Sequence, residues 1–238
     1  MKNKKNRKLI VGIIIFLLLF SFILWHNKEN INNYKEEKHK IKEVEKYEEI
    51  STSVVEDQII KEYQKAFNND KILGELSIPD TSLKVPVVQG SDNNYYLNHL
   101  LDKSYSILGS VFLDYRNSVD DRKILIYGHN SETLYTEFRF LENYINKDYY
   151  EGHKDIYFRT LNDMYHYKIF SVYIAKSDIR HVNLKLSYNE YVNHLTWLKE
   201  QSLYDIGEEV TDEDILILQT CYFKPKGSYL IIAAKKDR

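Results

Sequence analysis

Short apolar runs divided by turn residues fill the chain from residue 72 onward. Runs that alternate between apolar and polar residues, or that stay apolar for about four to eight residues, are typical of β-strands. Clusters of Asn, Asp, Gly and Pro between the runs indicate turns. The predicted strands cover residues 72–78, 83–88, 110–115, 123–127, 155–160, 165–175, 214–221 and 229–234. Eight short strands with helices in their connections predict a mainly β, α+β domain built on a closed or nearly closed β-barrel.

Helical periodicity occurs at the start of this domain and within its connections. One apolar stripe with the spacing of a single helix face predicts a helix that packs on the domain; it comprises Val55, Ile59, Ile60, Tyr63 and Phe67. A second stripe predicts an amphipathic helix between two strands; it comprises Leu134, Phe138, Leu141 and Ile145. Residues 93–101 predict a short helix, with Asp92 as its cap.

The connection from residue 176 to residue 213 is too long for a plain loop in a compact domain. Ser187 and Glu190 have the spacing of a capping box, in which two side chains satisfy backbone N–H groups at the start of a helix. Apolar residues then recur at helical spacing as far as Leu198. We therefore expect an inserted helix over residues 188–203, before the last two strands.

The amino-terminal end has a different pattern. Residues 9–25 form a run of seventeen residues without a charge, and five basic residues precede it. At about 1.5 Å per residue, such a helix is near the lower limit for crossing a bilayer. The basic residues are expected to stay in the cytoplasm. A cleaved signal peptide is the alternative, but the apolar run is longer than usual for that role and no small-x-small cleavage site follows.

Four segments follow from these patterns. We expect a cytoplasmic basic tail at residues 1–8, a transmembrane anchor at residues 9–25, a charged stalk at residues 26–53 that buries little, and a folded domain at residues 54–238. The protein is thus expected to cross the cell membrane once, with its folded domain outside the cell.

Net charge is −2, from 33 basic and 35 acidic side chains in 238 residues. Because five of the basic residues lie within the first eight, the remainder of the chain is distinctly acidic. A folded domain of that sign is unsuited to nucleic acid, so no nucleic-acid partner is expected.

Cys221 is the only cysteine of the chain. A lone thiol in an exported protein has no intrachain disulfide partner, so it is either inert in the core or reactive. Its place at the end of a strand favours the reactive alternative, because a rigid sheet holds site residues there. His129 also follows a strand directly, through Gly128, whereas the other histidines, including His181 and His194, are interpreted as surface or half-buried residues. A thiol and an imidazole form the usual nucleophile and base of a cysteine enzyme.

Other chemistries lack the residues that they need. One cysteine and scattered histidines cannot build a zinc site, so neither a metal nor a cofactor is expected. The sequence contains no phosphate-binding loop, no dinucleotide fingerprint and no Gly-x-Ser-x-Gly motif. Aspartates at strand ends, such as Asp114, are interpreted as turn residues and not as catalytic carboxylates.

These features resemble the sortase family, and class B sortases in particular. Leu-Gln-Thr-Cys221 is similar to the family's Thr-Leu-x-Thr-Cys strand end, and Tyr127-Gly-His-Asn130 is similar to the segment that carries its histidine. Further similar segments occur in the same order at residues 78–79, 86–90, 92–97 and 109–116. The inserted helix is also a class B feature. The resemblance covers about residues 54–236.

The resemblance implies an eight-stranded sortase-type β-barrel and a membrane-anchored cysteine transpeptidase. Cys221 would attack the Thr carbonyl of a C-terminal sorting signal on an exported protein and break a Thr–Gly or Thr–Asn bond. An amine of the peptidoglycan or of its lipid-linked precursor would then take the acyl group, with His129 as general acid and then base. Four further residues match positions at or near the family's substrate groove: Thr220, Asn93, Leu97 and Tyr127.

One departure from the family pattern concerns its third catalytic residue, an arginine on the last strand that holds the substrate backbone or the oxyanion. After Cys221 this chain has no arginine before Arg238. The loss of such a donor can cost on the order of 10²–10³ in rate. Tyr229 and Lys226 are the candidate replacements. The alternatives to a transpeptidase are a membrane-tethered cysteine peptidase and a catalytically impaired sortase-like binding module. Pilin-polymerising members of the family commonly have a carboxy-terminal membrane segment. This sequence has no such segment before Arg238, so we expect wall anchoring and not pilin polymerisation.

Overall fold

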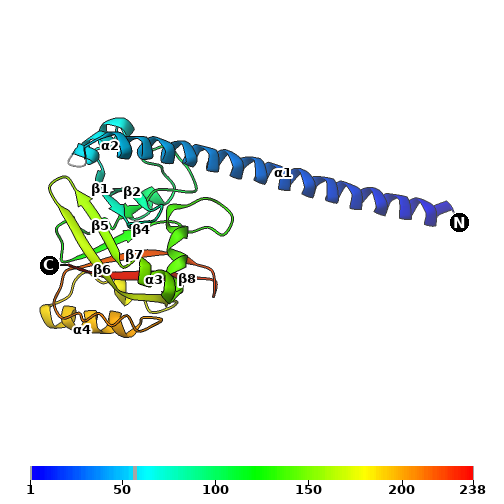
Figure 1. Cartoon of the computed structure of the whole chain (residues 1–238). Helices are drawn as coiled ribbons and strands as arrows, with labels where there is room; N and C mark the ends of the chain where they lie inside the picture. The colour runs from blue at the N-terminus through cyan, green and yellow to red at the C-terminus, as the bar shows by residue number, and fades with distance from the viewer. Residues whose placement is uncertain (1, 56–57, 238) are drawn as a thin grey trace.

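Eight strands close into one barrel in the order β1-β2-β3-β4-β7-β8-β6-β5 (Figure 1). The computed structural model describes residues 2–55 and 58–237, except for the side chains of residues 2–13, 16, 20 and 23. The strands are β1 Ile72–Ser77, β2 Lys84–Val88, β3 Phe112–Leu113, β4 Lys123–Tyr127, β5 Asp155–Thr160, β6 Met164–Ala175, β7 Ile215–Tyr222 and β8 Ser228–Lys236. Because β1 pairs with both β2 and β5, the sheet has no free edge between them. The predicted eight-stranded barrel is confirmed.

Two hydrophobic clusters lie on opposite faces of the central strands. Leu216 and Leu218 of β7 point into the barrel, whereas Ile215 and Ile217 belong to a cluster on the outer face. A strand that is covered on both faces has to be apolar at every position. This explains why the segment before Cys221 is a continuous apolar run and not an alternating one.

The outer cluster is covered by α4 Tyr188–Glu200, which lies along one side of the barrel (Figure 1). The predicted capping box between Ser187 and Glu190 is present, so the inserted helix is confirmed, although it ends three residues earlier than expected. The interpretation of His181 and His194 as surface or half-buried residues is wrong. Both are buried, because the inserted segment folds back onto the barrel.

The remaining short elements depart from the expectations mainly in length. The predicted helix over residues 93–101 is reduced to the 3₁₀ turn η2 Tyr95–Leu97, and the predicted strand 110–115 is reduced to β3. The other helices are α2 Ile59–Phe67, η3 Glu137–Ile145, α3 Lys147–Gly152 and η4 Arg180–Val182. The buried residues of α2 are those of the predicted stripe, whereas Val55 precedes the helix and is exposed.

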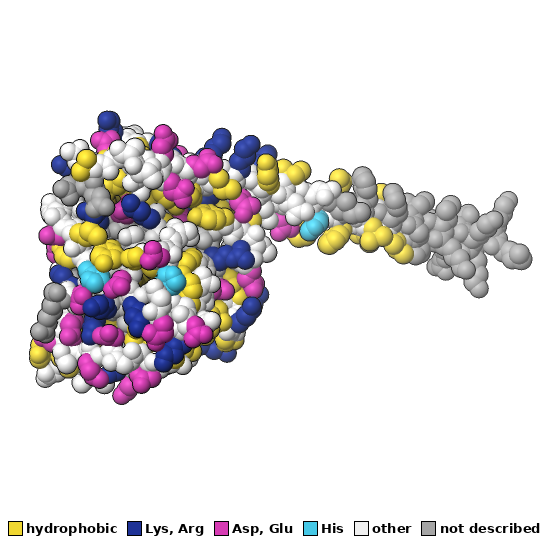
Figure 2. Space-filling view, in the orientation of Figure 1, with side chains coloured by type: hydrophobic (Ala, Val, Ile, Leu, Met, Phe, Trp, Pro, Cys, Tyr) yellow, Lys and Arg dark blue, Asp and Glu magenta, His cyan; other side chains and the backbone are white. Residues whose placement is uncertain are grey.

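A single helix, α1 Lys2–Ser53, begins outside the domain and ends on its surface (Figures 1 and 2). In the part of the chain that the structure describes, no helix has both the length and the apolar character needed to cross a membrane. Several side chains of the expected anchor, at residues 9–13, 16, 20 and 23, lie outside that description.

The expectation that residues 26–53 bury little is wrong for the second half of α1. Lys40, Glu43, Val44 and Tyr47 are buried against the domain. Their spacing of i, i+3, i+4 and i+7 is that of one helix face. Two of the four are charged, so a search for apolar residues at helical spacing does not detect this stripe. The charges are paired, since the Lys40 ammonium lies 2.8 Å from Glu43 and 2.6 Å from Glu137 of η3.

Candidate active site

Parallel pairing of β4 and β7 brings the two predicted catalytic residues to the same end of the barrel. Tyr127 lies opposite Gln219, and the Gly128 N–H continues the ladder by donating to the Gln219 carbonyl over 3.2 Å. His129 and Cys221 each follow two residues after this pair. The residues are therefore far apart in the chain, but one rung of the sheet brings them together.

The backbone beside these two residues is tightly held. The Thr220 hydroxyl donates to the Gly128 carbonyl over 2.7 Å. A Cβ atom at Gly128 would lie 2.6 Å from the Phe138 ring, so only glycine fits between the strand and η3. Thr220 is buried and its side chain is committed to this bond. The structure therefore places the Thr220 side chain on the inner face of the barrel, and its place in the substrate groove stays a prediction.

Cys221 is exposed and has a free thiol. Desolvation by the groups packed around its sulfur raises the pKa of the thiol above the ordinary value. Because its pKa is raised, the thiol of the resting site is neutral, so attack on a substrate requires that its proton pass to a neighbouring base. Gln219 lies on the same face of β7 as Cys221, since side chains alternate along a strand.

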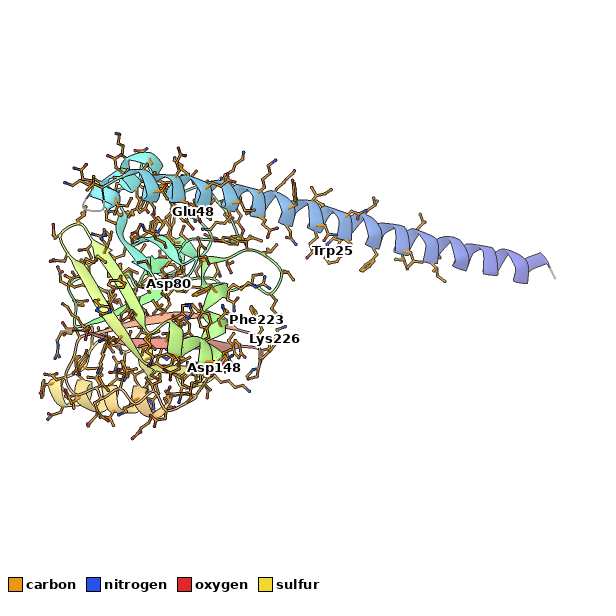
Figure 3. All side chains as sticks on the ribbon, viewed as in Figure 1. Trp25, Glu48, Asp80, Asp148, Phe223 and Lys226 are labelled. Carbon is orange, nitrogen blue, oxygen red and sulfur yellow. The ribbon has the colours of Figure 1, made fainter. Side chains whose placement is uncertain are left out.

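Tyr229 of β8 is the direct partner of Cys221 across the antiparallel pair. Side chains at such positions share a face, with Cβ atoms about 4.5–5.5 Å apart. Lys226, in contrast, is exposed on the β7–β8 connection, where Figure 3 shows it beside Phe223. Of the two candidate replacements for the family arginine, Tyr229 is therefore the one that the register places next to the thiol.

His129 is half-buried, and its Nε2 lies 2.6 Å from the Leu97 carbonyl oxygen. A carbonyl only accepts hydrogen bonds, so Nε2 carries the hydrogen of the neutral imidazole. Nδ1 is then the nitrogen that can take a proton. Leu97, which is expected near the substrate groove, thus contributes its backbone to the orientation of His129.

Two other predicted substrate residues, Asn93 and Tyr127, meet on the buried carboxylate of Asp114. The Asn93 amide and the Tyr127 hydroxyl donate to its Oδ2 over 3.0 and 2.9 Å. Arg116 donates to both carboxylate oxygens, over 2.8 and 2.6 Å. Burial works against the charge, but the hydrogen bonds, those from Arg116 first, hold the pKa of Asp114 below its ordinary value. Asp114 is a turn residue as expected, since its Oδ1 accepts from the Arg116 N–H, and it also organises the side chains of Asn93 and Tyr127.

The inserted segment is tied to this region from the other side. The Arg116 guanidinium also donates to the Val182 carbonyl over 3.1 Å. The ring of His181 bonds the Gln219 side chain, with 2.9 Å between Nε2 and Oε1. Burial lowers the pKa of His181, so the ring is neutral near pH 7. Neither bond has a local sequence signal, because the partners come from separate elements.

The sequence and the fold have counterparts among known proteins. Residues 76–237 match the model of the sortase domain. The chain is 32% identical to a sortase B of Listeria monocytogenes, over 64% of this chain and 63% of that protein. It is 27% identical to a sortase B of Staphylococcus aureus, over 87% of this chain and 88% of that protein.

A solved structure of a sortase B complexed with triglycine superimposes with a TM-score of 0.74 at 25% identity, covering 86% of this chain and 98% of the other. The barrel order, the helix inserted before the cysteine strand, and a thiol and an imidazole at adjacent strand ends therefore have one explanation. The chain belongs to the sortase family of cysteine transpeptidases, and it resembles the class B members.

Proposed function

We propose that this protein cleaves a C-terminal sorting signal of an exported protein after Thr and transfers the acyl group to an amine of the cell wall. Cys221 is the nucleophile and His129 the general acid and base. The main support is the continuation of the β4–β7 ladder past Tyr127, which carries both residues to one end of the barrel. An amine acceptor is in keeping with the sortase B that was solved with triglycine.

The first half of the reaction forms a thioester. The sulfur attacks the Thr carbonyl carbon while the thiol proton passes to Nδ1 of His129, because the thiol is neutral in the resting site. The tetrahedral intermediate then collapses, and the imidazolium gives its proton to the amine that leaves. The Leu97 carbonyl holds the ring through Nε2 during both transfers.

The second half reverses these roles. An amine attacks the thioester carbon, His129 takes the proton that the amine loses, and the thiol is regenerated as the new amide forms. Water in place of the amine would give hydrolysis, which is the peptidase alternative. The negative oxygen of each intermediate needs a donor, and the Tyr229 hydroxyl is our candidate because Tyr229 pairs directly with Cys221.

We also propose that residues 9–25 attach the protein to the cell membrane, with the barrel outside the cell. The support is the apolar run and the basic residues before it. Figure 3 shows the β7–β8 connection, with Phe223 and Lys226, on the side of the domain from which α1 and Trp25 project. In this arrangement the end of the barrel that carries Cys221 faces the membrane surface, where lipid-linked wall precursors would lie.

The experiment incubates the purified full-length protein with triglycine and two labelled peptide pools, which contain either a Thr–Gly or a Thr–Asn bond. We expect a ligated product from at least one pool and a thioester on Cys221 by mass spectrometry. Cys221→Ala should abolish both, and His129→Ala should lower turnover by at least about 100-fold. His166→Ala, in a half-buried histidine of β6, is the matched control and should retain activity.

The products separate the alternatives. Unchanged turnover in Cys221→Ala would contradict the proposal outright. Hydrolysed product alone, at every triglycine concentration, would identify a peptidase. Absence of any thioester with either pool would identify a binding module, which is the alternative that the missing arginine raises.

A further inference from the structure

The hydrogen-bond ladder between β4 and β7 does not stop at the last residue of β4. In a parallel pair, each second N–H of one strand donates to each second carbonyl of the other. The Gly128 N–H donates to the Gln219 carbonyl, and the Gly128 carbonyl accepts from the Thr220 hydroxyl. The next N–H of β4 in this series would be that of residue 130, and it would donate to the Cys221 carbonyl. That rung is present, but the donor is the side-chain amide of Asn130, with 2.9 Å between Nδ2 and the carbonyl oxygen.

The use of a side chain for this rung frees the backbone. Because the side chain of Asn130, and not its backbone N–H, bonds the Cys221 carbonyl, the main chain at His129 can leave the sheet while the two strand ends stay joined. The imidazole is thereby free to reach the Leu97 carbonyl, which lies on a different element. A ladder continued by backbone groups alone would hold residue 129 in the pleat of the sheet.

The orientation of the Asn130 amide is determined by its surroundings. Nδ2 donates to the Glu142 carboxylate of η3 as well as to the Cys221 carbonyl. A flipped amide would set its oxygen against two acceptors. The oxygen, Oδ1, is instead buried without a partner among the described residues. Buried polar atoms are rarely left in this way, and a catalytic role is one of the recognised explanations for an exception.

We propose that Asn130 is a positioning residue of the transpeptidase reaction: its amide, oriented by Glu142, holds the Cys221 backbone at a set distance from His129. The inference rests on the proposed function, because it concerns the same transpeptidase reaction. In it, Asn130 makes no contact with substrate. Glu142 is then a positioning residue as well, since its carboxylate determines the orientation of the Asn130 amide. Asn130 is 6% exposed, so a competing bond to bulk solvent is restricted.

The test measures kcat and KM of the full-length protein with the peptide pool that the wild type accepts. Asn130→Ala should lower kcat by about 10-fold to 100-fold, because small misplacements of reacting groups cost rates of this order. KM should stay within about threefold, since the substrate contacts remain. Asn117→Ala is the matched control. Asn117 is a buried asparagine that bonds the other end of β4, so its loss should lower stability but not kcat per folded molecule.

A second pair of variants covers the case in which Asn130→Ala does not fold. Glu142→Gln and Glu142→Ala both remove the charge, but only glutamine keeps an oxygen that can accept from Asn130. We expect Glu142→Gln to keep wild-type kcat and Glu142→Ala to lose several-fold. Equal kcat for these two variants, or wild-type kcat in folded Asn130→Ala, would overturn the positioning role. A wild-type protein that forms no thioester would instead overturn the proposed function.

Discussion

At the scale of single residues, Tyr229 is the partner of Cys221 across β7 and β8, and we expect it to replace the arginine of the family pattern. The family arginine offers a planar, charged fork with several donors. A tyrosine hydroxyl offers one neutral donor at the end of a rigid ring. Tyr229 packs against the outer cluster, so its ring is held on the face that carries the thiol. A neutral donor would support the oxyanion with less electrostatic stabilisation than arginine.

We expect Tyr229→Phe to lower the rate of thioester formation by about 10²-fold to 10³-fold, because an oxyanion donor is lost while the ring is kept. Lys226→Ala should change the rate by less than about threefold, since Lys226 is exposed on the connection. Tyr222→Phe is the matched control, since that ring points into the barrel. Single-turnover kinetics, followed by mass spectrometry, give these rates. A large loss in Lys226→Ala with none in Tyr229→Phe would reverse the assignment.

At the scale of elements, α1 is joined to the catalytic domain by a buried charge cluster. Lys40 lies between Glu43 and Glu137 and also donates to the Gly109 carbonyl over 2.8 Å. Burial alone would lower the pKa of Lys40, but the two carboxylates raise it above the ordinary value. Glu137 is the first residue of η3, the element that also carries Glu142. The helix that leads to the predicted anchor is therefore part of the folded unit and not a loose stalk.

Removal of the cation from this cluster should be costly. We expect Lys40→Met to lower the free energy of unfolding by about 3–5 kcal/mol, because two buried carboxylates lose their partner. The triple variant with Glu43→Gln and Glu137→Gln should recover most of the loss. Lys38→Met, in an exposed residue of α1, is the control. Urea denaturation followed by circular dichroism measures these values. A Lys40→Met protein as stable as the Lys38→Met protein would contradict the buried cluster.

At the scale of the whole molecule, α4 and the segment before it lie over a buried lysine. The Lys123 ammonium contacts the Asn183 carbonyl at 2.8 Å and Nε2 of His194 at 2.7 Å. Burial, and then the charge of Arg116, lower the pKa of Lys123 to about 7. Burial also lowers the pKa of His194 to about 3, so its ring is a neutral acceptor. The folded protein therefore favours a neutral lysine where the unfolded chain carries a charged one.

This difference predicts how stability depends on pH. Between pH 7 and the ordinary lysine value of 10.5, the unfolded chain binds a proton that the folded protein releases. The free energy of unfolding should therefore rise with pH across this window, by about 2–5 kcal/mol in total. Lys123→Met should flatten the rise and stabilise the protein at pH 7. Urea denaturation at a series of pH values up to about 9.5 tests this, with Lys185→Met as the exposed control. An unchanged slope in Lys123→Met would contradict the prediction.

Features that depend on local pattern were predictable from the sequence. The strands around Cys221 and His129 were found because apolar runs with turn residues at their ends have a local signal, and the same holds for the capping box at Ser187. The burial of His181, His194 and Lys123 had no such signal, because it comes from the folding of α4 over the barrel. The charged stripe of α1 was missed for a related reason: a buried charge looks like a surface charge until its partner is known.

The amino-acid sequence by itself determined which segments become strands, that one thiol and one imidazole stand at strand ends, and that a helix is inserted before the last two strands. These properties follow from side-chain periodicity and backbone preference, which act over a few residues. Only the tertiary structure decided that β4 lies parallel to β7, that Tyr229 faces Cys221 while Thr220 faces the interior, and that Asn130 reaches the Cys221 carbonyl. Such contacts join residues far apart in the chain, and their register is set by the packing of the whole barrel.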